Sequence, residues 1–155
     1  MSYTRILYHI VLRTKHSEKS ISQQNVSSLY KYIWGIIKNK RGTLYRINGL
    51  EDHVHILSDL PPTIALSDYI KDIKVASSLR MKQSGEFSLF RAWSEGYAAF
   101  TCSFKERDTL INYIKNQQEH HKKESPKEEL KRLFAEHGIE WNERFFPEQF
   151  NPLRG

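Results

Sequence analysis

The sequence predicts an α+β fold of the ferredoxin-like type: a split βαβ antiparallel sheet with helices on one face, plus C-terminal helices. Strand-like and helix-like stretches alternate in the order β-α-β-β-α-β-α-α, and the first six elements match that pattern. With 155 residues, 39% of them hydrophobic and 27% charged, the chain can bury one core. We therefore expect a single domain over residues 1–155, with a core of about 3–122 and a helical extension of about 123–155.

The first strand is expected over Tyr3–Thr14, a stretch rich in Tyr, Ile, Val and Leu. Ser20 and Ser22 offer N-caps for a helix that continues to about Lys40, because the apolar residues that follow them recur at helical spacing. Gly42 is a stop signal for this helix. Together these segments predict the first strand and helix of the fold.

Two further strands, Thr43–Leu50 and His53–Leu60, are expected on either side of a short turn at Glu51-Asp52. Pro61-Pro62 ends the second of these strands. The segment from about Asp68 to Lys82 is predicted to be the second helix, because its apolar positions recur every third residue.

The predicted fourth strand is Tyr97–Cys102. A third helix is expected from about Lys105 to Lys122, with Ser103 and Glu106 in capping-box spacing, and a fourth over Pro126–His137. The arrangement leaves the other face or one edge of the sheet free for a ligand or a second subunit.

The charge of the chain favours a polyanionic partner. The formal net charge is +6 and the pI is near 9.4, and Lys and Arg that bind phosphates release counterions. Cys102 is the single cysteine, so no intramolecular disulfide is expected and a reducing compartment is favoured. No stretch has the apolar core of a signal peptide or the roughly 18 apolar residues of a membrane span. We therefore expect a cytoplasmic protein without a membrane partner.

The strongest chemical signal lies in Asp52–Leu57, which contains two histidines two residues apart. In a strand, His53 and His55 project from one face, while Val54 and Ile56 point into the opposite layer under the helices. Two imidazoles placed in this way can share one metal ion. The alternative is a pair of ordinary surface histidines, and a short His-x-His motif alone does not exclude it.

A second signal lies in the third predicted helix, where Tyr113 and Gln117 share one helix face. The amide oxygen of Gln117 can ligate a hard cation, and the phenol of Tyr113 can act as a nucleophile. Alternatively, Tyr113 is a core aromatic beside Leu110 and Ile114. His120-His121, one turn later, is expected to be an exposed helix end rather than a second metal site. Combined with the histidine pair, a phenol and an amide suit metal-assisted phosphoryl transfer.

Five segments match one known family in the same order along the chain. They are Tyr8–Lys15, Asp52–Leu57, Ile73–Ser78, Trp93–Tyr97 and Tyr113–Gln117. On these segments the chain resembles the insertion-sequence-200-like transposases, which are single-tyrosine members of the HUH nuclease superfamily. The resemblance extends over roughly residues 5–145.

This resemblance implies a DNA transposase that nicks and rejoins single-stranded DNA. Tyr113 would be the catalytic nucleophile, left attached to a 5′ phosphate while a 3′ hydroxyl departs. His53, His55 and Gln117 would hold the divalent metal cofactor, Mg²⁺ or Mn²⁺. The implied partners are single-stranded DNA with hairpins at the element ends and a second copy of the chain in a homodimer. In such a dimer the tyrosine helix of one subunit can complete the metal site of the other.

Basic residues at strand ends and on helices are the candidates for DNA binding. Those expected to contact phosphate are Arg13, Lys15, Lys74 and Arg80. For each of them the alternative is an ordinary solvated position. Trp93 and Phe90 are candidates for stacking on unpaired bases or, alternatively, for packing against the sheet.

Two other functions stay open from the sequence. The first is a domesticated or non-catalytic relative of the transposase, which binds DNA without cleaving it. The second is a small replication-initiator or relaxase-type nuclease of the same superfamily, although these proteins share the histidine pair in generally larger chains. An RNA-binding module is disfavoured, because no Lys/Arg-Gly-Phe-Gly-Phe-like run is present.

Overall fold

Four antiparallel strands form one sheet in the order β2-β3-β1-β4. The strands are β1 (Leu7–Arg13), β2 (Leu44–Gly49), β3 (His53–Asp59) and β4 (Ala98–Cys102). The structure is a computed structural model that describes residues 1–146, so residues 147–155 of the expected extension lie outside the described part. The strand order and the helices between the strands confirm the predicted fold class.

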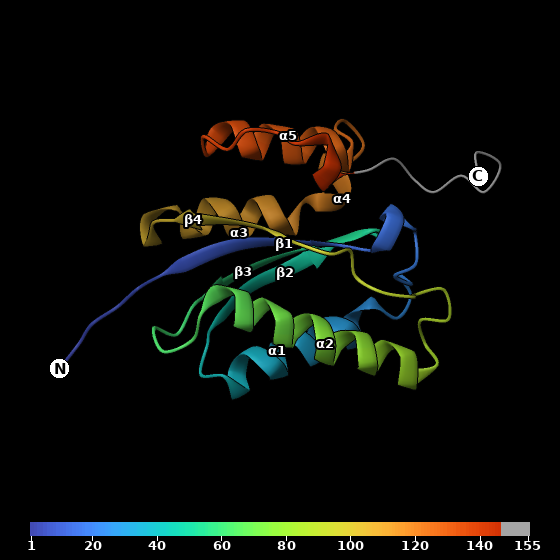
Figure 1. The fold of residues 1–155 in the computed structure, drawn as a ribbon, viewed down its shortest axis with the longest axis horizontal. Coiled ribbons are helices and arrows are strands. Elements are labelled where there is room, and N and C mark those ends of the chain that lie inside the picture. Colours follow the sequence, from blue (N-terminus) through green and yellow to red (C-terminus); the bar gives the residue numbers. More distant parts are fainter. Residues whose placement is uncertain (147–155) are drawn as a thin grey trace.

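Helices lie on both faces of the sheet (Figure 1). The helices α1 (Val26–Asn39) and α2 (Leu66–Ser84) cover one face, while α3 (Arg107–Lys115), α4 (Gln117–His120) and α5 (Pro126–Glu136) lie on the other. On that second face α3 contacts β2 and β3, and α5 packs on β1 and β4. Within the described residues the C-terminal helices fill this face, so it is not the free surface that was expected, and the alternative of a free sheet edge stays a prediction.

The alternation of side chains along β3 separates the apolar core from the polar side of the sheet. Val54 and Ile56 are buried in the main core with α1 and α2. Because neighbouring strand residues point to opposite faces, His53 and His55 face the layer of α3, α4 and α5. The opposed orientation of these two pairs agrees with the interpretation of the sequence pattern.

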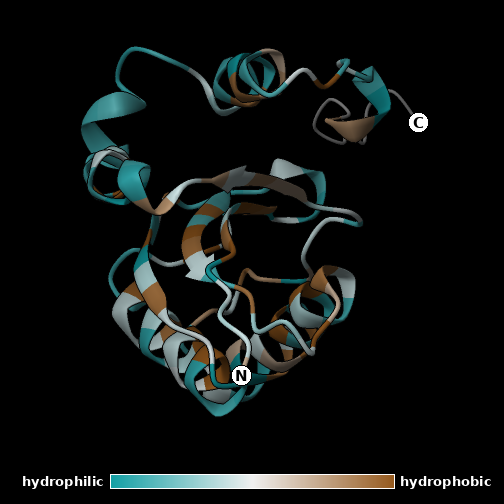
Figure 2. Cartoon of the chain, turned by 90° about the vertical axis from the view of Figure 1, so that its left-hand side faces the viewer, coloured by the Kyte–Doolittle hydropathy of each residue, from teal (hydrophilic) through white to brown (hydrophobic). Residues whose placement is uncertain are grey.

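A smaller second core joins α5 to the sheet. Its buried members are Val11, Ala98, Phe100, Leu130, Leu133 and Phe134. Figure 2 shows hydrophobic colouring on the central strands and on stretches of the helices that surround them. The extension is therefore packed on the sheet through its own apolar contacts. Within residues 1–146, no helix combines the length and the apolar character that a membrane crossing requires.

The third predicted helix is divided in the structure. A 3₁₀ turn (Phe104–Glu106) precedes α3, and the chain departs from helical geometry at Asn116, between α3 and α4. The side-chain amide of Asn48 in β2 donates to the carbonyl oxygens of Ile114 and Lys115, at 3.0 and 3.1 Å. These carbonyls are among the last of α3, so the neighbouring strand satisfies them and helps to end the helix.

The remaining predicted boundaries differ by a few residues, which is ordinary for helix ends. The largest difference is at α1, which begins at Val26 rather than after Ser20 or Ser22. The backbone N–H groups of Ser20 and Ile21 both donate to the carbonyl oxygen of Glu51, at 3.0 and 2.9 Å. This segment is therefore held against the β2–β3 turn and cannot take part in the helix.

Candidate active site and metal centre

His53 and His55 are buried side by side on the face of β3 that the C-terminal helices cover, with exposed fractions of 2% and 0%. Nδ1 of His53 lies 2.6 Å from Oδ1 of Asp52, the residue just before the strand. Burial acts to raise the pKa of the Asp52 carboxyl, but its hydrogen bond with His53 and the charge of that ring lower the pKa overall. A ring that donates from Nδ1 presents the lone pair of Nε2 to the site.

His55 has a second imidazole as its neighbour. Nδ1 of His55 lies 2.7 Å from Nε2 of His9 in β1, and Nε2 of His55 lies 2.9 Å from Oε1 of Glu129 in α5. Burial lowers the pKa of both imidazoles, and the mutual repulsion of the two rings lowers the pKa of His9 further. Both rings are therefore favoured in the neutral form, which is the form that ligates metals.

The helix break at Asn116 does not separate Gln117 from Tyr113. Gln117 is fully buried, and its Oε1 lies 3.3 Å from Nε2 of His53. The Tyr113 hydroxyl donates to Oε2 of Glu129 and accepts a hydrogen bond from Nη2 of Arg132 at 2.8 Å. Tyr113 therefore lies beside the three predicted ligands, within a single chain.

The carboxylate of Glu129 lies at the centre of this cluster, and the sequence analysis did not identify it. Glu129 is 1% exposed. Its Oε1 faces His55, and its Oε2 accepts from the hydroxyl of Tyr113 and, at 3.0 Å, from Nε2 of Gln117. Burial acts to raise the pKa of Glu129, but the charge of His55 and the hydrogen bonds that the carboxylate accepts hold this pKa well below its usual range.

The environment of Tyr113 keeps its phenol protonated. Burial raises the pKa of Tyr113, and the negative charge of Glu129 and its hydrogen bond raise it further. The guanidinium of Arg132 acts in the opposite direction, because a neighbouring positive charge favours the phenolate. Added positive charge near the carboxylate would favour the phenolate form of Tyr113.

His121 is the second residue of the cluster that the sequence analysis placed differently. Its side chain is 4% exposed, so it is not part of an exposed helix end. Nε2 of His121 lies 2.9 Å from Oε1 of Gln117 and 3.1 Å from Oε1 of Glu129. Its Nδ1 donates to the carbonyl oxygen of Glu124 at 2.7 Å.

The spacing of these atoms suits a bound metal ion. One ligand atom each from His53, His55, His121 and Glu129 forms a group in which all atoms lie within 4.8 Å of one another. Metal–ligand bonds of about 2.1 Å place neighbouring ligand atoms roughly 3.0–3.4 Å apart. The observed contacts of 2.9 to 3.8 Å around Glu129 are close to that spacing.

The side of the cluster on which Tyr113 lies opens to the surface. A cavity of about 420 Å³ is lined by Tyr113 and His120 together with polar residues of α3 and α4. The other lining residues are Thr109, Asn112, Asn116, Glu119 and Lys123.

The four predicted DNA-binding residues have different surroundings. Arg13 is 6% exposed, donates to the carbonyl oxygen of Phe145 and to Ser17 Oγ, and packs over the Phe145 ring. Lys74 is half-buried and donates to the carbonyl oxygens of residues 94 and 96. Lys15 and Arg80 are exposed. The structure thus leaves two of the four fully accessible in this conformation.

The two aromatic residues considered for base stacking are buried instead. Phe90 and Trp93 are 4% and 7% exposed and pack on each other with ring centroids 5.3 Å apart. The indole Nε1 of Trp93 donates to Ser77 Oγ at 3.0 Å. Both side chains therefore belong to the main core, as the packing alternative predicted.

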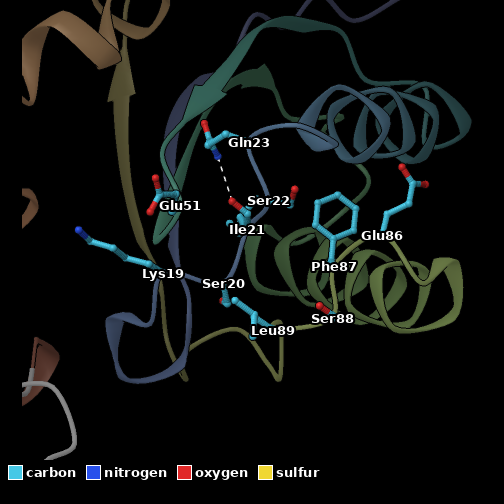
Figure 3. Close-up of a pocket in the computed structure, with 10 residues that line it drawn as sticks. All are labelled: Lys19, Ser20, Ile21, Ser22, Gln23, Glu51, Glu86, Phe87, Ser88 and Leu89. Carbon is cyan, nitrogen blue, oxygen red and sulfur yellow. Dashed lines mark hydrogen bonds between the residues drawn. The ribbon is translucent and has the colours of Figure 1, made fainter.

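A separate pocket of about 360 Å³ lies between the segment before α1 and the segment after α2 (Figure 3). Gln23 in its wall donates to the carbonyl oxygen of Ile21 at 3.2 Å. Its charged lining residues are Lys19, Glu51 and Glu86. The lining shares no residue with the histidine cluster, so this pocket is not part of that site.

Two solved structures have similar folds. A crystal structure of a proposed transposase from Deinococcus radiodurans aligns with a TM-score of 0.58 and 23% identity, over 75% of this chain and 93% of that chain. A REP-associated tyrosine transposase bound to a REP hairpin aligns with a TM-score of 0.59 and 13% identity, over 78% of this chain and 72% of that chain. At these identities the likeness shows the fold.

Sequence comparison identifies the family. The transposases for insertion sequence element IS200 of Salmonella typhimurium and Salmonella typhi are each 26% identical over 120 residues, covering 74% of this chain and 78% of the relative. The family profile described as "Transposase IS200 like" matches residues 2–117. That match includes the histidine pair, Tyr113 and Gln117 and covers most of the chain, which therefore belongs to the IS200-like transposase family.

Proposed function

We propose that this transposase cleaves and rejoins single-stranded DNA with Tyr113 as the nucleophile. The observation that supports this most directly is the position of the phenol. Its hydroxyl donates to one oxygen of Glu129, and the other oxygen of the same carboxylate faces Nε2 of His55. The phenol and the His55 imidazole therefore lie on two sides of one carboxylate, an arrangement that fits metal-assisted phosphoryl transfer.

In this proposal His53, His55 and Gln117 hold a divalent ion, Mg²⁺ or Mn²⁺. When bound, the ion polarises a non-bridging oxygen of the scissile phosphate and adds positive charge near the phenol. Tyr113 Oη attacks phosphorus and gives its proton to Oε2 of Glu129. As the bond from phosphorus to the 3′ oxygen breaks, the proton held by Glu129 passes to the departing 3′ oxygen through water, so that the strand leaves with a 3′ hydroxyl and the carboxylate is regenerated.

The product is a 5′-phosphotyrosine, which conserves the energy of the phosphodiester bond. A 3′ hydroxyl of the same or another strand reverses the reaction and regenerates the tyrosine, so that rejoining needs no nucleotide cofactor. Arg132 donates to the phenol oxygen at 2.8 Å and stabilises the negative charge on that oxygen when it acts as nucleophile or leaving group.

The DNA that we propose as substrate is a single strand with hairpins, because the structurally similar REP-associated tyrosine transposase was solved with a hairpin. Lys15 lines a cavity of about 830 Å³ and Lys74 one of about 510 Å³, and residues 93–95 border both. Lys15 and Lys74 are proposed phosphate contacts on this side of the molecule, and the exposed Arg80, whose guanidinium lies over the Tyr32 ring, is a further proposed contact. Arg13 could join them only after leaving the Phe145 carbonyl.

The site described above is assembled within one chain. Tyr113, Gln117 and Glu129 meet the two histidines of their own sheet. A homodimer stays a prediction of the family resemblance, and the proposed chemistry does not depend on it.

The proposal is tested with a labelled single-stranded hairpin substrate and a divalent ion. The wild-type chain is expected to give a covalent protein–DNA adduct, and Tyr113→Phe is expected to lose the adduct while it still binds the hairpin. Tyr45→Phe is the matched control, because Tyr45 lies on β2 and its hydroxyl contacts Arg5 rather than the cluster. An adduct that persists in Tyr113→Phe removes Tyr113 from its role. Hairpin binding by the wild type without any nicking supports a non-catalytic DNA-binding relative.

A further inference from the structure

We propose that His121 and Glu129 are metal ligands, so that the segment after the tyrosine helix completes the metal centre. This inference deepens the proposed function and rests on it for the role of the ion in cleavage, but ion binding is measurable without DNA. Neither residue lies within residues 2–117, the part of the chain that the family profile matches. The two residues would add an imidazole and a carboxylate to the donors from His53, His55 and Gln117.

The first support is that all three imidazoles are oriented in the same way. Each ring has its Nδ1 next to a fixed acceptor and its Nε2 pointing towards the cluster. For His53 the acceptor is Oδ1 of Asp52, at 2.6 Å. For His55 it is Nε2 of His9, at 2.7 Å, and for His121 it is the carbonyl oxygen of Glu124, at 2.7 Å. Such partners are the usual means by which proteins fix the tautomer of a ligating histidine.

The second support is that the groups facing one another are mostly acceptors. Oε1 of Glu129 lies 2.9, 3.1 and 3.8 Å from Nε2 of His55, His121 and His53. The amide oxygen of Gln117 lies 2.9 Å from Nε2 of His121. If each Nε2 presents a lone pair, these atoms repel one another unless protons or a cation lie between them. A single cation satisfies all of them at once.

The third support is that the two oxygens of Glu129 face different partners. Oε1 faces the imidazoles, whereas Oε2 accepts from the hydroxyl of Tyr113 and from Nε2 of Gln117. One oxygen is therefore available to an ion while the other stays hydrogen-bonded to the nucleophile. As a ligand, Glu129 would fix the distance between the ion and the phenol.

The donor set also indicates the class of metal. Three imidazoles favour first-row transition ions, whereas Mg²⁺ prefers an environment of oxygen atoms. We therefore expect the wild-type chain to bind one Mn²⁺ or Co²⁺ ion at least about tenfold more tightly than Mg²⁺. Equal affinity for Mg²⁺ and Mn²⁺ contradicts a centre built from three imidazoles.

The experiment is a calorimetric titration of the full chain with MnCl₂ in the absence of DNA. Glu129→Gln is expected to weaken Mn²⁺ binding by about 10- to 100-fold or more, because an anionic ligand becomes a neutral amide. Glu128→Gln is the matched control: it makes the same change one residue earlier on α5, at an exposed position, and is expected to bind like the wild type.

A second variant tests the imidazole. His121→Asn is expected to weaken Mn²⁺ binding and to change the visible absorption of the Co²⁺-loaded chain, since one nitrogen ligand is lost. His137→Asn, at the end of α5 where the ring packs on Phe100, is expected to change neither. Circular dichroism reports folding, and if Glu129→Gln does not fold, the titration of His121→Asn decides.

The inference is overturned if folded Glu129→Gln or His121→Asn binds Mn²⁺ with wild-type affinity while His53→Ala loses binding. In that case the ion is held by the donors of β3 and Gln117 alone. Adduct formation by Tyr113 would be unaffected by this outcome, so failure of the inference and failure of the proposed function are distinguishable.

Discussion

Nε2 of His9 lies 2.7 Å from Nδ1 of His55, and the two rings stack with their centroids 5.0 Å apart. Both residues are almost fully buried, on neighbouring strands of the sheet. For Nε2 of His55 to present a lone pair to an ion, the N–H at Nδ1 of His55 must donate to Nε2 of His9. His9 is thus a positioning residue, which sets the tautomer and the orientation of a proposed ligand without touching the ion.

His9→Leu is therefore expected to weaken Mn²⁺ binding by about tenfold while all ligands are retained. His9→Gln is the paired variant, because its amide oxygen can accept the same hydrogen bond and is expected to restore most of the affinity. Calorimetric titration measures both variants. Equal affinities for His9→Leu and the wild type would show that the contact does not orient His55.

Gly49 at the end of β2 is expected to tolerate no side chain. A Cβ at this position would lie 2.1 Å from the carbonyl oxygen of His53 and 2.8 Å from Cα of Val54. Both neighbours are backbone atoms of β3, so the strands must separate next to the first histidine of the site. Gly49→Ala is expected to lower the free energy of unfolding by about 3 kcal/mol and to weaken Mn²⁺ binding.

Gly35→Ala is the control for this substitution. Gly35 lies within α1, and a Cβ there meets nothing within 4 Å. Alanine is expected to stabilise the chain by about 0.5–1 kcal/mol, because it reduces the conformational freedom of the unfolded state. Urea denaturation measures both variants. Equal stabilities of the two would contradict the close approach at Gly49.

The stability of the metal-free chain is expected to fall in acid partly through Glu129. In the folded chain the pKa of this carboxyl lies below its ordinary value of 4.5: burial alone would raise it, but the charge of His55 and the hydrogen bonds from His121, His55 and Tyr113 lower it more. The unfolded chain therefore takes up a proton first as the pH falls. The stability that the Glu129 carboxylate contributes is fully present above about pH 5 and is lost progressively below it.

Urea denaturation of the wild type and Glu129→Gln in the presence of a chelator measures this effect. As the pH is lowered from 6 to the lowest value at which both proteins fold, the free energy of unfolding of the wild type is expected to fall more than that of Glu129→Gln. A difference between the two proteins that stays constant over this range would show that the Glu129 carboxylate contributes no pH-dependent stability.

The orientation of the histidine pair was predictable from the sequence, because strand alternation is a strong local rule. Once Val54 and Ile56 are assigned to the main core, His53 and His55 must face the other side. The relation between Tyr113 and Gln117 was also predictable from helical spacing. It is kept in the structure although the helix is interrupted at Asn116.

The position of Glu129 was not predictable by such rules. A helix end and a loop separate Glu129 from Gln117, so no single period relates these two side chains. His121 differs from Glu129 in this respect, because it lies four residues after Gln117 and its place beside that amide follows from helical spacing. Glu129 is directed to the site by the packing of α5 on the sheet through residues such as Leu130 and Phe134. That packing is a tertiary contact, and it also fills the face of the sheet that was expected to be free.

The basic residues show a second limit of prediction from the sequence. Formal charge does not distinguish the exposed Lys15 from Arg13, which donates to a carbonyl oxygen 132 positions further along the chain. Only the position of the C-terminal segment shows which guanidinium is already engaged.

The packing of α5 on the sheet also has a consequence for the order in which a ribosome makes the protein. Translation delivers the sheet, both histidines and Tyr113 before Pro126–Glu136 exists. The nascent polypeptide therefore has the proposed nucleophile and the histidine pair before it has the carboxylate between them. The cluster is therefore complete only after α5 has been made and has packed on the sheet.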